Sequence, residues 1–123
     1  MDETVTLFRP VGQKEFELVR EGGFRFFPPR LPNQPILYPV LTRSYAEQIA
    51  RQWNTRDAGS GHVGYVLQFS VKLEFLGRYE VHCVGDSTHQ EYWIPAADLE
   101  EFNRNITGRI EVVAEFRSSV QTS

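Results

Sequence analysis

Apolar and polar residues alternate with a period of two in several short stretches of the chain, a pattern typical of β-strands. The first such stretch, TVTLFR at 4–9, ends at Arg9–Pro10. The segment ILYPVL at 36–41 is a further strand candidate, although Pro39 restricts it to an edge or a bulge because proline has no N–H to donate. The later strands are predicted at 65–71, 79–85, 91–94 and 109–116.

Helical periodicity marks the segment between the first two strands. In residues 12–23, Phe16, Leu18 and Val19 fall on one side of a helix, and Gly22–Gly23 is a strong signal for its end. A proline-rich stretch follows at 24–35, with four of the seven prolines of the chain. Prolines fix φ and remove donors, so this stretch is predicted to be a rigid extended loop.

The clearest helix is predicted at 42–53. Tyr45, Ile49 and Trp53 recur there at i, i+4 and i+8, and Ser44 with Glu47 fits a capping box. Residues 55–64 read as a loop, because their glycines precede a strand and do not fit a phosphate-binding motif. A short turn or helical turn is expected at 73–78, and a short helix at about 96–103.

The predicted order is β-α-β-α followed mostly by strands. Short connections in the second half favour antiparallel pairing, so the fold class is α+β. We expect a single domain over residues 1–116 and a polar tail over 117–123.

Composition and charge narrow the choice of function. The 123 residues carry a formal net charge of −3 with scattered Lys and Arg, which argues against a dedicated nucleic-acid binder. The start of the chain lacks a signal-peptide pattern, and no apolar stretch approaches the ~20 residues of a membrane span. A cytoplasmic protein without a membrane partner is therefore expected.

Side chains that could bind a metal or act as nucleophiles do not show the sequence spacing that is usual for metal sites or nucleophilic enzymes. Cys83 is the one cysteine and is predicted to be a small core residue. His62, His82 and His89 lie far apart, so no metal is expected. No GxSxG elbow is present. A glycosidase-like carboxylate pair of Asp86 and Glu91 is a weak alternative among 16 acidic residues.

The remaining candidates are Arg9, Tyr38, Tyr45 and Glu91, and each also has a purely structural interpretation. Arg9 fits a solvated strand end, and Tyr45 shares an apolar stripe with Ile49 and Trp53. Tyr38 fits packing under the proline-rich loop, and Glu91 fits an ordinary carboxylate at a strand entry.

The order of these segments resembles the ADP-ribosyltransferase superfamily, and particularly its small bacterial proteins of the "ADP-ribosylation/crystallin J1" type. The resemblance spans about residues 4–116 and is strongest in FPPRLPNQPILYPVL and EFNRNITGRIEVV. It implies an ADP-ribosyltransferase-like fold, with a split, mostly antiparallel sheet flanked by two main helices and one short helix. It also implies a bacterial protein with NAD as its substrate.

The resemblance implies roles for individual residues. Glu91, Arg9 and Tyr38 would be catalytic, with Glu91 bonding the ribose 2′-hydroxyl, and Arg9 holding a phosphate or ribose. Tyr38 would hold the nicotinamide side. Tyr45 would stack on the nicotinamide, and His89 and Gln90 would supply further contacts to NAD. Arg30 is a second candidate for the pyrophosphate on its chemistry alone, because a guanidinium fork suits phosphate oxygens.

Three functions remain open at this point. The first is an NAD-dependent ADP-ribosyltransferase or NAD glycohydrolase whose acceptor is protein, nucleic acid or water. The second is a non-catalytic nucleotide- or partner-binding module on the same fold. It is favoured because His89 stands two residues before Glu91, where the superfamily often has Gln or Glu. The third is a structural or regulatory domain whose proline-rich loop contacts a partner.

Overall fold

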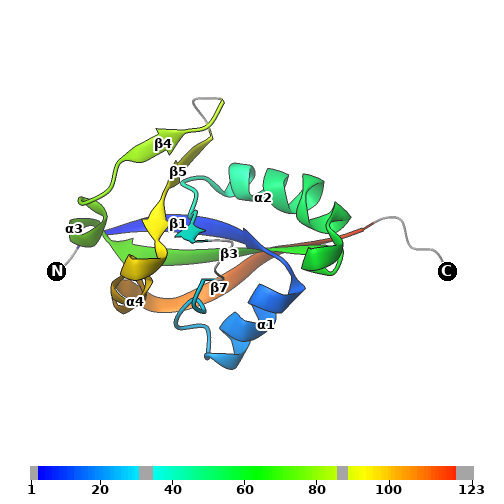
Figure 1. Cartoon of the computed structure of the whole chain (residues 1–123), viewed down its shortest axis with the longest axis horizontal. Helices are drawn as coiled ribbons and strands as arrows, with labels where there is room; N and C mark the ends of the chain where they lie inside the picture. Colours follow the sequence, from blue (N-terminus) through cyan, green and yellow to red (C-terminus); the bar gives the residue numbers. More distant parts are fainter. Residues whose placement is uncertain (1–2, 31–34, 86–88, 119–123) are drawn as a thin grey trace.

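The structure is a computed structural model, and the residues that it describes are 3–30, 35–85 and 89–118. An antiparallel three-stranded sheet runs through the middle of the molecule (Figure 1). In this sheet β3 (Val63–Lys72) lies between β1 (Thr4–Val11) and β7 (Ile106–Arg117). The predicted α+β class with antiparallel pairing is confirmed.

Backbone pairing extends the sheet beyond β1 through a single residue, Val40. Val40 exchanges two backbone hydrogen bonds with Phe8 of β1, at 2.8 and 2.9 Å, and forms a bridge with Glu91 of β5 (Gln90–Tyr92). In turn, β5 pairs with β4 (Val81–Cys83), which places His82 opposite Glu91. Because neighbouring strands lie about 4.8 Å apart, the backbones of Phe8 and Glu91 are separated by about 10 Å.

Two very short strands flank the Val40 segment. These are β2 (Ile36–Leu37) and β6 (Ile94–Pro95), which pair antiparallel. β2 ends just before Tyr38, and β6 begins just after Trp93. Their pairing brings these two aromatic residues together. Of the strand predicted at 36–41, the structure has Ile36–Leu37 as β2 and an isolated bridge residue at Val40, beyond Pro39.

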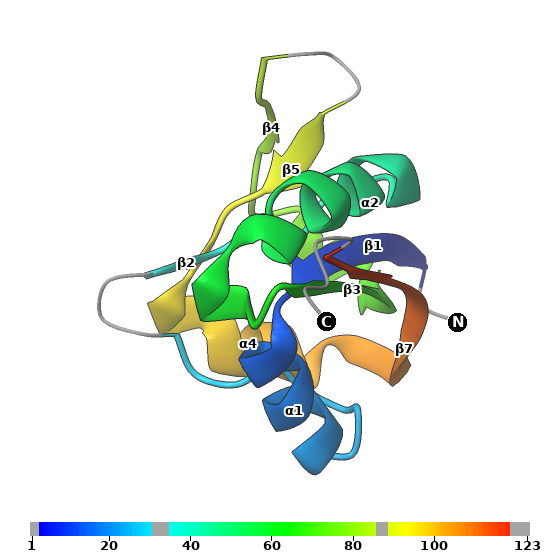
Figure 2. The same cartoon turned by 90° about the vertical axis from the view of Figure 1, so that its right-hand side faces the viewer.

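Helices cover both faces of the three-stranded sheet (Figure 2). On one face lie α1 (Gln13–Glu21) and α4 (Leu99–Arg104), and on the other lies α2 (Arg43–Gln52). The four-residue helix α3 (Leu73–Leu76) follows β3. Short 3-10 turns occupy Asn54–Arg56, Ala58–Ser60 and Ala96–Asp98.

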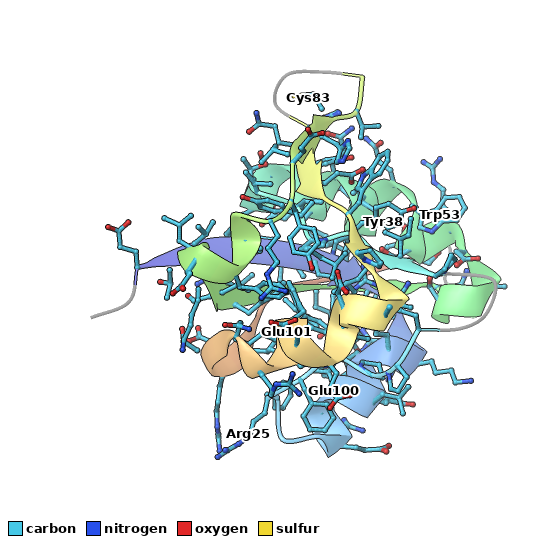
Figure 3. The ribbon with its side chains drawn as sticks, turned by 60° about the vertical axis from the view of Figure 1, so that its left-hand side comes forward. Arg25, Tyr38, Trp53, Cys83, Glu100 and Glu101 are labelled. Carbon is cyan, nitrogen blue, oxygen red and sulfur yellow. The ribbon has the colours of Figure 1, made fainter. Side chains whose placement is uncertain are left out.

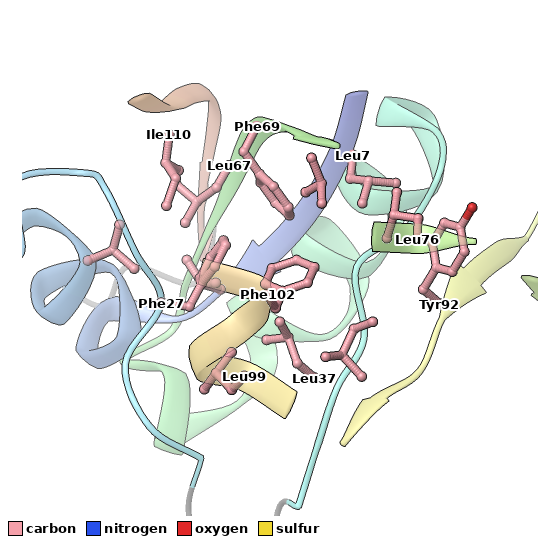
Figure 4. Close-up of a cluster of buried hydrophobic side chains, with 14 of the residues drawn as sticks. Leu7, Phe27, Leu37, Leu67, Phe69, Leu76, Tyr92, Leu99, Phe102 and Ile110 are labelled. Atoms are coloured by element: carbon pink, nitrogen blue, oxygen red, sulfur yellow. The ribbon is translucent and has the colours of Figure 1, made fainter. Parts of the chain in front are cut away.

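The alternation of side chains along the strands divides the interior into two clusters. Leu7 and Leu67 face the larger cluster with α1 and α4, whereas Phe8 and Val66 face α2. Aromatic rings fill the larger cluster, where Phe27 meets Phe69 edge to face at 4.9 Å (Figure 4). Such rings each bury on the order of 150–250 Å², so this cluster holds the sheet to α4.

A glycine allows α2 to approach β3 closely. A Cβ atom at Gly64 would lie 2.7 Å from the carbonyl oxygen of Ala50 and 2.8 Å from its Cβ. Ala46 and Ala50 are both fully buried, so small residues line both sides of this crossing. Close backbone packing thus fixes the position of α2 on the sheet.

Several sequence predictions about local structure are wrong. Cys83 is exposed, not in the core, because it lies on the short outer strand of the β4–β5 hairpin. The cap of α2 is Thr42, whose Oγ1 accepts from the backbone N–H of Tyr45 at 3.3 Å, and not Ser44. The apolar stripes of both main helices also extend onto the surface, since Leu18 is 41% exposed and Trp53 is 64% exposed.

Element boundaries differ from the predictions by a few residues. The first strand continues past Arg9 to Val11, and β3 begins two residues earlier than expected, at Val63. β7 starts at Ile106 and continues through Arg117.

Within the described residues, no helix is both long enough and apolar enough to cross a membrane.

Candidate functional site

A cleft of about 720 Å³ opens beside the end of β1. Its walls come from residues 9–12, from α1, from the proline-rich loop at 28–30 and from the segment 35–40. The end of α2, the turns after it and Glu91 complete the lining. This volume is within the usual range for a site that binds a small molecule.

A buried ion-pair cluster of Arg9, Glu15 and Arg30 forms one part of the lining. Arg9 donates from Nε to Glu15 Oε2 at 2.6 Å and from Nη2 to Oε1 at 2.9 Å. Arg30 Nη1 lies 3.6 Å from the same Oε1. Two guanidinium groups share one carboxylate, so the cluster carries an excess positive charge, which suits a phosphate group.

Local structure explains the position of Glu15. It lies in the first turn of α1, where a carboxylate interacts favourably with the helix dipole. Burial alone would raise the pKa of Glu15, but Arg9 and Arg30 together lower it below its ordinary value. Glu15 is therefore ionised at neutral pH and holds the fork of Arg9 in a fixed orientation. The Nη1 atom of Arg9 takes no part in the two bonds to Glu15.

The second charged feature of the cleft is Glu91, which is 9% exposed. Trp93, two residues further along the chain, donates from Nε1 to Glu91 Oε1 at 3.0 Å. Tyr45 of α2 also contacts this carboxylate. Burial, the charge of Glu91 and a hydrogen bond to it raise the pKa of the Tyr45 phenol. Glu91 thus accepts a hydrogen bond from Trp93 and lies beside the phenol of Tyr45.

An imidazole ring covers each of the two aromatic side chains beside Glu91, Trp93 and Tyr45. His82 stacks on Trp93 with ring centroids 3.7 Å apart, and His89 stacks on Tyr45 at 4.4 Å. Tyr38 meets the Trp93 ring edge to face at 6.1 Å. The surroundings of Glu91 are therefore rigid and largely aromatic, an environment that strengthens electrostatic interactions.

The cleft has a different character near the end of α2. Trp53 is the most exposed of the large apolar side chains in the described residues, and it lies on the same side of the molecule as Tyr38 (Figure 3). Asn54 beside it is 6% exposed and donates from Nδ2 to Ser60 Oγ at 3.0 Å. Within the described part of the chain, its Oδ1 is buried without a hydrogen-bond partner.

The structure brings four of the predicted site residues to this one cleft: Arg9, Arg30, Tyr38 and Glu91. The other three lie outside its lining. Tyr45 and His89 stack on each other behind Glu91, and the Gln90 amide lies 3.9 Å from the sulfur of Cys83. Asp86, the alternative partner of Glu91, lies outside the described residues.

Sequence reasoning missed Glu15, Trp53 and Trp93. Trp93 had a signal, because residues i and i+2 of an extended segment share a face, which puts Trp93 on the side of Glu91. Glu15 had a weaker signal, as a carboxylate in the first turn of a helix that directly follows the Arg9 strand. Trp53 was assigned to an apolar stripe that the structure leaves at the surface.

Comparisons with protein-family models, with curated proteins and with solved structures give no match to this chain. Within residues 3–30, 35–85 and 89–118, no group of three His, Cys, Asp or Glu side chains is placed to hold a metal ion. Any function must therefore be argued from the cleft itself.

Proposed function

We propose that this chain is an NAD-consuming enzyme, either an ADP-ribosyltransferase or an NAD glycohydrolase, with Glu91 as its catalytic carboxylate. One observation carries the proposal. Arg9, Tyr38 and Glu91, which the resemblance singles out from three distant parts of the sequence, all line the same cleft. Backbone pairing through Phe8, Val40 and Glu91 sets the three segments side by side.

The proposed reaction breaks the bond between the ribose C1′ and the nicotinamide nitrogen. The bonding electron pair leaves with nicotinamide, and positive charge develops on the ribose. An acceptor oxygen or nitrogen then bonds to C1′ and loses its proton. If the acceptor is water, the products are ADP-ribose, nicotinamide and a proton. The acceptor of a transferase reaction would be a protein or nucleic acid.

Glu91 suits this reaction because its carboxylate is buried and already oriented by Trp93 and Tyr45. A preorganised negative charge stabilises positive charge where it forms, without a reorganisation cost during the reaction. Arg9 and Arg30 supply the positive charge that the pyrophosphate requires. Tyr38 offers an aromatic surface to the cationic nicotinamide ring.

The alternative is a non-catalytic nucleotide- or partner-binding module in the same cleft. Two contacts favour it: Arg9 is held in two hydrogen bonds by Glu15, and Glu91 accepts one from Trp93. Both charges therefore have partners before any ligand binds. The further hypothesis, that the proline-rich loop contacts a partner, depends partly on residues 31–34, which lie outside the described residues.

Calorimetric titration of the protein with NAD, with nicotinamide assayed in the same sample, tests the proposal. Binding accompanied by nicotinamide release is the expected result. Binding without release, both alone and with protein and nucleic-acid acceptors added, would favour the binding module. No binding at millimolar NAD would contradict both nucleotide functions.

A further inference from the structure

The lining of the cleft includes Glu91, Ile49 of α2 and Trp53, which follows the end of α2. Tyr45, in the first turn of the helix, contacts Glu91, and Trp53 follows at its other end. The N–H of Trp53 still bonds to the carbonyl of Ile49 at 2.8 Å, so the helical path continues to this residue. Eight residues separate Tyr45 from Trp53, a distance of about 12 Å along the helix axis.

The Trp53 end of the cleft has the properties of a base-binding site. The indole is 64% exposed and lines the cleft, which leaves a flat aromatic surface open to a ligand. Leu18 and Ile49 supply apolar surface nearby in the same lining. Asn54, next in the chain, also lines this end of the cleft, while its Oδ1 is fully buried and bonded to none of the described residues.

We propose that Trp53 stacks on the adenine ring of NAD. This inference rests on the proposed function, since it takes Glu91 as the position of the nicotinamide ribose. In NAD the two ribose–base units are joined by a pyrophosphate. When the nicotinamide ribose lies at Glu91, the adenine lies at the other end of the NAD molecule. The direction of α2 away from Glu91 leads to Trp53. The cluster of Arg9 and Arg30 supplies charge for the pyrophosphate between them.

The test compares the wild type with Trp53→Phe and Trp53→Ala. Trp53→Ala should bind NAD about tenfold more weakly, as expected from the loss of one base–aromatic stack. Trp53→Phe keeps an aromatic face and should retain most of the affinity. Because Trp53 is largely exposed, neither change should disturb folding, and thermal unfolding verifies this.

Nicotinamide mononucleotide, which lacks the adenylate half, is the decisive second ligand. Its dissociation constant should be the same for the wild type and Trp53→Ala. If Trp53→Ala weakened the binding of NAD and of the mononucleotide by the same factor, the inference would be overturned. If the mononucleotide is too weak to measure, AMP replaces it, and then Trp53→Ala must weaken binding.

Failure of this inference differs from failure of the proposed function. If wild type does not bind NAD, the proposed function is wrong and the inference falls with it. If wild type binds and cleaves NAD while Trp53→Ala binds it equally well, only the role of Trp53 is wrong.

Discussion

At the scale of single residues, the orientation of Glu91 depends on groups that flank it on two sides. Trp93 donates a hydrogen bond to Oε1 of Glu91. The Trp93 ring is stacked on the imidazole of His82 and meets the Tyr38 ring edge to face. A carboxylate on a strand can otherwise rotate about its side-chain bonds. The indole N–H removes much of this freedom, so Trp93 acts as a positioning residue for Glu91.

Trp93→Phe tests this role, because phenylalanine retains an aromatic ring beside His82 but has no N–H. We expect nicotinamide release to slow by about tenfold, since a hydrogen bond to a charged group contributes about 1.5–3 kcal/mol. Steady-state kinetics should show the loss mainly in kcat, with KM for NAD little changed. Tyr79→Phe is the matched control, because it removes a donor to a carboxylate, Asp98, outside the cleft lining. If both variants kept the wild-type rate, Trp93 would have no positioning role.

At the scale of secondary-structure elements, the width of the cleft depends on how closely α2 packs against β3. Gly64 and Ala50 meet at this crossing, where a Cβ on the glycine would lie 2.7 Å from a backbone oxygen. A backbone atom cannot move aside as the end of a flexible side chain can. Added volume here must therefore displace α2, which carries Ile49 and leads to Trp53.

Gly64→Ala should destabilise the protein by about 1–3 kcal/mol, as overpacking of a well-packed interior does. Gly77→Ala is the matched control, since its new Cβ would have only ordinary contacts, the nearest at 3.5 Å from Glu74 O. We expect that variant to stay within about 1 kcal/mol of wild type. Urea unfolding midpoints measure both, and equal midpoints for the two variants would contradict close packing at Gly64.

Most elements could be predicted from the sequence because their signals are local. Alternation located the strands, and Gly22–Gly23 correctly marked the end of α1. The errors came from properties that depend on neighbours distant in the sequence. Cys83 has the pattern of a buried strand residue, yet no layer covers β4. Trp53 has helical spacing from Tyr45, yet its side chain is 64% exposed.

The candidate site was predictable only in part. Arg9, Tyr38 and Glu91 were proposed from the resemblance and Arg30 from the charge that a pyrophosphate requires, and their common cleft could not be derived from spacing alone. Tyr45 of α2 and His89 stack on each other outside the cleft lining, and the Gln90 amide lies beside Cys83 of the β4–β5 hairpin. Which side chains share a cleft depends on the sheet pairing through Val40, a residue with no sequence signal for that role.

At the scale of the whole molecule, the cluster of Arg9, Glu15 and Arg30 joins β1, α1 and the proline-rich loop. Its two ion pairs are well shielded, with the side chains of Arg9 and Arg30 only 10% and 8% exposed. Removal of one partner would leave a buried charge uncompensated, which is costly. The same contacts that hold the two guanidinium groups in place thus also stabilise the fold.

The lowered pKa of Glu15 gives this contribution a defined pH dependence. The folded-state pKa lies below the ordinary value of 4.5, so the stabilisation is fully present above pH 4.5. It is lost as pH falls through the folded-state pKa, when the carboxylate takes up a proton. Wild type should therefore exceed Glu15→Gln in unfolding free energy at pH 7, and the gap should narrow below pH 4.5. Glu100→Gln, at an exposed ion pair, should show no such gap. A gap for Glu15→Gln that stayed constant down to pH 2 would refute this assignment.

The central claim is that Glu91 stabilises the charge that develops as NAD is cleaved. The most direct measurement is the rate of nicotinamide release by wild type, Glu91→Gln and Glu100→Gln at saturating NAD. We predict that Glu91→Gln lowers the rate by about 100- to 1,000-fold while NAD still binds, because only the preorganised charge is lost. Glu100→Gln, which changes a side chain that is 88% exposed, should match wild type. Release by Glu91→Gln at the wild-type rate would contradict the account.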